Sequence, residues 1–156
     1  MGSRRTLVRS EQWWNHKVPP VVAVACIAIG ANPGPATGRQ LVDLVLVLVS
    51  IVGVAAFGHL LNDWTDLDVD ARGGKANVLA SLTPRARARA VVLALVVGLG
   101  PWVWLPPRRG AWLALGVEVG LLVAYSVPPV RLKARGWLGA LADAGYAYAV
   151  PFVLVA

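Results

Sequence analysis

The chain has 156 residues, of which 57% are hydrophobic and only 15% are charged. Its mean hydropathy of +0.62 lies outside the balance of an ordinary soluble domain, so the composition predicts a membrane protein. The net charge of +7 could suit nucleic acid, but a basic excess in so apolar a chain is typical of cytoplasmic loops, and we expect no nucleic-acid partner.

Five apolar segments follow one another along the chain. We expect helices near residues 13–31, 41–63, 88–105, 111–127 and 137–156. The uninterrupted part of the second segment, residues 41–61, would form a helix about 31 Å long, which is enough to cross a bilayer. Residues 1–156 are therefore predicted to form a single membrane domain, an all-α polytopic transmembrane bundle of about five helices.

The first segment has an alternative interpretation. Its apolar core covers only residues 18–31, unless the helix also takes in residues 13–17 with Trp13 and Trp14 at the membrane interface. A basic stretch before a short apolar core also describes a secretory signal peptide. The pair Pro19-Pro20 and the two bulky tryptophans fit such a peptide poorly, so we favour a retained helix.

Basic residues are distributed unevenly between alternate loops. Twelve of the lysines and arginines lie before residue 18, in residues 62–89 and in residues 128–136, whereas three lie in residues 32–40 and 106–110. Because cytoplasmic loops hold the excess of Lys and Arg, we expect the N-terminus and the two basic loops to face the cytosol. The predicted location is the cell (plasma) membrane.

Four oxygen-bearing side chains lie at the cytoplasmic end of the second segment: Asn62, Asp63, Asp66 and Asp70. Residues three and four apart share a face of a helix, so the four would face the same way if the helix continued through them. Carboxylate and amide oxygens, with room left for water and phosphate, suit Mg²⁺. The alternative is a solvated acidic stretch, but charges at the end of a membrane helix are more often functional.

Basic side chains are predicted on the same side of the membrane as this acidic motif. Lys75 follows it closely, and Arg131 and Lys133 lie in the next cytoplasmic loop. A carboxylate-held Mg²⁺ beside such cations is suited to binding a diphosphate, whose negative charge the metal and the cations would neutralise together. Taken alone, Arg131 and Lys133 could also serve only as topology signals.

The string Asn62-Asp63-x-x-Asp66-x-x-x-Asp70 and the loop Tyr125-Ser126-x-Pro128-Pro129-x-Arg131-Leu132-Lys133 resemble two motifs of the UbiA-type intramembrane prenyltransferase superfamily. The resemblance implies Mg²⁺-dependent transfer of a prenyl group from a prenyl diphosphate to a small acceptor at the cytoplasmic face of the membrane. It makes Asn62 and Asp66 the main metal ligands, with Asp63 and Asp70 completing the set. Lys75, Arg131 and Lys133 would bind the diphosphate.

The family also has a second aspartate-rich motif, in a half of the fold that this chain does not contain. We therefore expect the first half of a UbiA-like fold, incomplete at the C-terminus, which a missing half or a homo-oligomer would complete. The alternative function is a non-catalytic or degenerate membrane subunit that binds a lipid diphosphate. CDP-alcohol phosphotransferases also use intramembrane aspartates, but Leu67 follows Asp66 where their pattern has glycine.

Four further residues are candidates for the acceptor side or the cavity: Lys17, His59, Tyr125 and Asp143. His59 lies one turn before Asp63 and could take a proton from an acceptor, although packing between helices is the simpler role for it. Asp143 could line the acceptor cavity or be a buried, hydrogen-bonded acid. The identity of the acceptor is left open.

The charge distribution makes a prediction about topology. In a Cys26→Ala background, a membrane-impermeant maleimide added to intact cells should label Gly110→Cys but not Gly73→Cys, because the loop with five basic residues is cytosolic. Mass spectrometry of the purified variants measures the labelling. Labelling of the Gly73→Cys variant from outside would reverse the predicted orientation.

Overall fold

The computed structural model of the protein describes residues 18–30, 37–105 and 109–155. All regular elements in these ranges are helical, which confirms the predicted all-α class. The elements are α2 (Val18–Gly30), α3 (Gly38–Thr65), α4 (Leu67–Arg72), η1 (Val78–Ser81), α5 (Pro84–Leu99), η2 (Gly100–Val103), α6 (Arg109–Ser126), η3 (Leu132–Ala134), α7 (Trp137–Ala144), the π-helical turn η4 (Gly145–Ala149) and α8 (Val150–Val155).

Three stretches of the described chain are helical, long and apolar enough to cross a membrane: Gly38–Thr65, Pro84–Val103 and Trp137–Leu154. The helix Gly110–Ser126 is apolar but shorter, and α2 has 13 residues. The protein is therefore an integral membrane protein with a helical bundle. Five full spans were predicted, and length and composition support three of them. Residues 13–17, which were expected to extend the first helix, lie outside the described residues.

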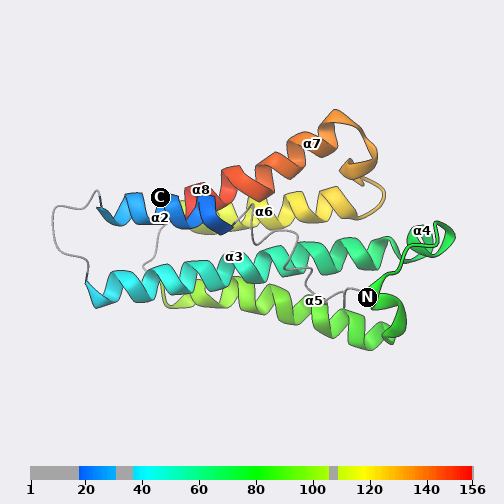
Figure 1. Ribbon diagram of the computed structural model, residues 1–156, viewed down its shortest axis with the longest axis horizontal. Coiled ribbons are helices and arrows are strands. Elements are labelled where there is room, and N and C mark those ends of the chain that lie inside the picture. The colour runs from blue at the N-terminus through cyan, green and yellow to red at the C-terminus, as the bar shows by residue number, and fades with distance from the viewer. Residues whose placement is uncertain (1–17, 31–36, 106–108, 156) are drawn as a thin grey trace, which may run out of the picture.

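The long helix α3 runs through the middle of the bundle. Figure 1 shows α5 along one side of it and α6 with α7 along the other. α3 begins with a capping box, in which Gln40 N donates to Thr37 Oγ1 at 3.3 Å and Thr37 N donates to Gln40 Oε1 at 2.8 Å. These two bonds satisfy backbone donors that a helix start otherwise leaves unpaired.

α3 and α5 approach each other most closely at two glycines. A Cβ added at Gly53 would lie 2.6 Å from Gly98 Cα, so the backbones are in direct contact there. Beside this contact, Ser50 Oγ donates to Gly98 O at 2.6 Å and accepts from Trp102 Nε1 at 2.7 Å. Ser50 is fully buried. Small residues and interhelical hydrogen bonds are the usual means by which membrane helices associate, because lipid is as apolar as the helix surfaces.

The opposite side of α3 packs against α6. Leu122 of α6 lies over Gly58, where an added Cβ would be 2.6 Å from Leu122 Cδ2. One turn before Leu122 in α6, Glu118 is 4% exposed, and its Oε2 has no hydrogen-bond partner in the described structure. This carboxyl oxygen is therefore a buried polar atom without a polar contact in the described residues.

The two loops that carry the predicted site lie at one end of the bundle. Figure 1 shows α4, which follows α3, at the same end as the turn between α6 and α7. Leu79 of η1 is fully buried in a cluster with Phe57, Leu60 and Val91, so the segment after α4 is fixed against the ends of α3 and α5. The fold thus brings together residues that are 65 to 71 positions apart in sequence.

The glycine contact makes a prediction about stability. Gly53→Leu should lower the free energy of unfolding by about 1–3 kcal/mol or more, because a side chain there must push the α5 backbone away. Gly116→Leu is the matched control, since nothing lies within 4 Å of a Cβ at Gly116. Thermal unfolding in detergent, followed by circular dichroism, measures both. Equal stability of the two variants would contradict the close α3–α5 contact.

Candidate diphosphate and metal site

The site begins where α3 ends. Thr65 is the last residue of α3, and its hydroxyl donates to Asn62 O at 3.0 Å. Asp66 separates α3 from α4, and its backbone N–H donates to Asn62 O at 3.1 Å. The N–H of Asp70 in turn donates to Asp66 O at 2.7 Å. Backbone hydrogen bonds to the fourth preceding residue thus continue across the junction, although Asp66 itself has a non-helical φ of −100° and ψ of 3°.

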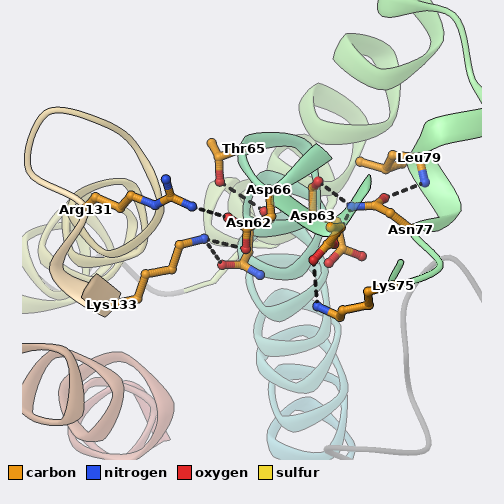
Figure 2. A network of polar contacts seen from close by, with 10 residues as sticks. Asn62, Asp63, Thr65, Asp66, Lys75, Asn77, Leu79, Arg131 and Lys133 are labelled. Atoms are coloured by element: carbon orange, nitrogen blue, oxygen red, sulfur yellow. Dashed lines mark hydrogen bonds and ion pairs between the residues drawn. The ribbon is translucent and has the colours of Figure 1, made fainter. Parts of the chain in front are cut away.

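Asn62 and Asp66 form the first of two groups of contacts at this junction. Lys133 Nζ lies 2.7 Å from Asn62 Oδ1 and 2.7 Å from Asp66 Oδ2, and Arg131 Nη2 lies 2.6 Å from Asp66 Oδ1. The side chains of Lys133 and Asp66 are each only 15% exposed. Figure 2 shows both cations reaching across from the loop after α6. The structure therefore brings together four of the predicted site residues.

Asp70 forms the second group, on the other side of the junction. It is buried, and its carboxylate accepts hydrogen bonds from Lys75 Nζ at 3.0 Å and Asn77 Nδ2 at 2.9 Å. Asn77 Nδ2 also donates to Asp63 O at 2.7 Å, while Asn77 Oδ1 accepts from Leu79 N at 3.0 Å. Figure 2 shows these contacts facing away from Arg131 and Lys133.

Asn77 is the residue to which sequence reasoning gave no role. It connects the end of α3, the carboxylate of Asp70 and the start of η1. The signal in the sequence was weak. An asparagine two residues before a backbone N–H that starts a helical turn is a common capping arrangement, and nothing in the sequence marked its second contact with Asp70.

The loop between α6 and α7 positions the two cations. Arg131 has a left-handed backbone with φ of 38°, and Arg135 Nη2 donates to Pro129 O at 3.2 Å, which closes the loop on itself. Gly139 at the start of α7 lies against this turn, since a Cβ there would be 2.8 Å from Leu132 O. Arg131 and Lys133 thus extend from a compact turn that is packed on α7.

The residues predicted for the acceptor side fall into three cases. Tyr125 of α6 and Tyr146 of η4 pack edge to face, with ring centroids 5.4 Å apart, and Tyr146 Oη donates to Asp143 Oδ1 at 2.5 Å. His59 is partly buried in α3, one turn before Asp63. Lys17 lies outside the described residues.

The donor atoms fit a cation at Asn62 and Asp66 better than at the full predicted set. Two oxygens, Asn62 Oδ1 and Asp66 Oδ2, already converge on one positive charge, the Lys133 ammonium. Asp70 accepts hydrogen bonds from Lys75 and Asn77 instead. No group of three or more His, Cys, Asp or Glu side chains in the described residues is arranged to hold a metal. Asn62, Asp63, Asp66 and Asp70 stay the predicted ligands, and Mg²⁺ binding stays a prediction.

The fold and this helix end define a membrane protein with a cation-rich, carboxylate-bearing site at one end of its bundle. The chain is 32% identical to the bacteriochlorophyll synthase 33 kDa chain of Rhodobacter capsulatus over 85% of its own length. It is 29% identical to the bacteriochlorophyll synthase 34 kDa chain of Chloroflexus aurantiacus over 75%, and 30% identical to the chloroplastic chlorophyll synthase of Arabidopsis thaliana over 78%.

These relatives belong to the UbiA-type prenyltransferase superfamily, whose motifs the sequence resembles. The chain belongs to the same superfamily. It spans 42% of the length of the Rhodobacter protein, 36% of the Chloroflexus protein and 34% of the Arabidopsis protein. No protein-family model matches the chain, and no solved structure matches it significantly.

The Asn77 contacts make a prediction about the second group. Asn77→Ala should destabilise residues 67–82 by about 1–3 kcal/mol, because Asp70 is buried and would lose a hydrogen-bond donor. Ser81→Ala is the control, since its hydroxyl makes an exposed bond to Val78 O. Hydrogen–deuterium exchange of this segment is the measurement. Unchanged protection in Asn77→Ala would mean that Asn77 does not hold the segment in place.

Proposed function

We propose that this chain binds the diphosphate of a prenyl donor in a membrane prenyltransferase that prenylates a tetrapyrrole acceptor. The observation that carries the proposal is the meeting of Arg131 and Lys133 with Asn62 and Asp66 at the end of α3. A membrane helix that ends in carboxylates, faced by two cations from a distant loop, has the charges needed to hold a polyanion together with a metal.

The proposed reaction begins with heterolysis of the bond between the prenyl C1 and the diphosphate oxygen. The electron pair leaves with the diphosphate, and an allylic cation remains. Arg131 and Lys133 would donate to the diphosphate oxygens, where negative charge develops as the bond breaks. Lys75, the third cation predicted for the diphosphate, is 48% exposed and pairs with Asp70 in the other group, which faces away from Arg131 and Lys133. An acceptor carboxylate oxygen then forms the new bond to C1, and no proton has to be removed.

Mg²⁺ is the proposed cofactor, held by Asn62 and Asp66, and when bound it supplies further positive charge to the diphosphate oxygens. The proposal also places the site on the cytoplasmic side of the plasma membrane, because the loops that form it carry most of the basic residues. The apolar bundle beside the site would exclude water from the allylic cation.

The tetrapyrrole acceptor is proposed from the relatives, which are named as chlorophyll and bacteriochlorophyll synthases. Tyr125, Tyr146 and Asp143 form a cluster in which the two rings pack edge to face and Tyr146 donates to Asp143. Two aromatic rings there can stabilise a nearby carbocation through their faces. We propose that this cluster faces the prenyl chain and the acceptor.

Binding of the donor tests the first part of the proposal. In the presence of Mg²⁺, Asp66→Ala should weaken binding of a non-hydrolysable geranylgeranyl thiodiphosphate by about tenfold or more, because the metal loses a ligand. Asp68→Ala removes a carboxylate from an exposed position of α4 and should bind like the wild type. Calorimetry on the protein in nanodiscs measures both. Equal affinities in the two variants would refute the assigned site.

Product formation tests the second part. Membranes containing the protein, given geranylgeranyl diphosphate and a chlorophyllide, should form a prenyl ester that mass spectrometry detects, and Asp66→Ala membranes should form none. Donor binding without any ester would instead support the alternative of a non-catalytic subunit that binds a lipid diphosphate. If the protein neither bound the donor nor formed the ester, both functions would be contradicted.

A further inference from the structure

The position of the Lys133 ammonium is unusual for a residue whose role is only to hold a diphosphate. Its Nζ lies 2.7 Å from both Asn62 Oδ1 and Asp66 Oδ2, the two oxygens that best fit a metal. Arg131 takes the remaining oxygen of Asp66 at 2.6 Å. Both oxygens of the Asp66 carboxylate are therefore already bound to positive charge.

An ammonium and a divalent cation would compete for these oxygens. Both would lie within bonding distance of the same two atoms, and their like charges would repel at short range with little water to screen them, since Lys133 and Asp66 are each 15% exposed. A metal ion would therefore bind here more tightly once the ammonium has moved away. The ammonium, in turn, can leave without becoming a half-buried unpaired charge only if another anion accepts it.

A diphosphate offers that second acceptor. Arg131 and Lys133 lie two residues apart on one compact turn, so one polyanion can accept hydrogen bonds from both side chains. We propose that Lys133 occupies the metal position of the empty site and moves onto the diphosphate when the donor arrives, so that metal and diphosphate bind as a coupled pair. This inference rests on the proposed function of the site.

Comparison with the Lys75–Asp70 pair shows why we assign the exchange with the metal to Lys133 and not to Lys75. Lys75 also contacts a carboxylate, at 3.0 Å, but it is 48% exposed and touches one oxygen of one side chain. The other oxygen of Asp70 is occupied by the neutral amide of Asn77, which no anion would draw away. Lys75 is thus beside its carboxylate, whereas Lys133 lies between two candidate metal ligands.

Metal affinity without diphosphate tests the proposal directly. Mn²⁺ serves as the probe, and the loss of the electron paramagnetic resonance signal of free Mn²⁺ measures binding to the full chain in nanodiscs. Lys133→Met should bind Mn²⁺ about tenfold more tightly than the wild type, because the competing charge is gone. Lys133→Arg keeps a cation in place and should bind Mn²⁺ weakly, as the wild type does.

Arg72→Met is the matched control. It removes one positive charge from the same end of the bundle, at an exposed position of α4. If Arg72→Met tightened Mn²⁺ binding as much as Lys133→Met, the effect would be the general electrostatics of this end of the bundle and the proposal would be overturned. It would also be overturned if Lys133→Met and the wild type bound Mn²⁺ equally, or if neither bound it.

The wild-type protein provides a second measurement that needs no variant to fold. With free Mn²⁺ held constant by a metal buffer, pyrophosphate should raise the Mn²⁺ affinity of the wild type about tenfold, and metal should raise the affinity for pyrophosphate by the same factor. Absence of this coupling would overturn the proposal. Coupled binding of Mn²⁺ and pyrophosphate without any prenyl ester would support the inference while refuting the proposed prenyl transfer. Donor binding that depends on Asp66, without this coupling, would overturn the inference alone.

Discussion

The direct backbone contact between α3 and α5 is the constraint on which the rest of the structure depends. Gly53 and Gly98 let the two helices touch, and the buried hydroxyl of Ser50 fixes their register through Gly98 O and Trp102. With α5 held there, η1 can pack Leu79 under the end of α3. The position of Asp70 and Asn77 follows from that packing, so a contact near the middle of the bundle determines half of the polar network at its end.

The sequence predicted the parts of the site that depend on regular spacing. Helical periodicity and charge distribution were enough to place Asn62 and Asp66 on the same side of the membrane as Arg131 and Lys133, and the structure brings these four together. The separation of Asp70 from Asp66 could not be predicted. It depends on the end of α3 at Thr65 and on the amide of Asn77, a contact seven residues away in sequence that no periodic pattern encodes.

Membership of the superfamily accounts for the meeting of the acidic motif with the basic loop, but the match to each relative is partial. The chain spans 42% of the length of the Rhodobacter protein, so the match leaves more than half of that relative uncovered. Glu118 is of interest in this respect. It is an acid buried between α6 and its neighbours, with one oxygen unpaired in the described structure, and it lies at a depth where charged groups normally have partners.

The length of α3 also bears on how the proposed prenyl donor would reach the site. With 28 residues, α3 is about 42 Å long, whereas the hydrocarbon layer of a bilayer is about 30 Å thick and the headgroups bring the total to about 40–45 Å. A helix of this length that starts near one headgroup layer and crosses without tilt would end in the other, which would put Asn62 and Asp66 at the depth of the lipid phosphates. The proposed prenyl diphosphate, anchored in that leaflet, would carry its headgroup in this plane. It would then meet Lys133 by lateral diffusion alone, and its mole fraction among the surrounding lipids would govern how often the site is occupied.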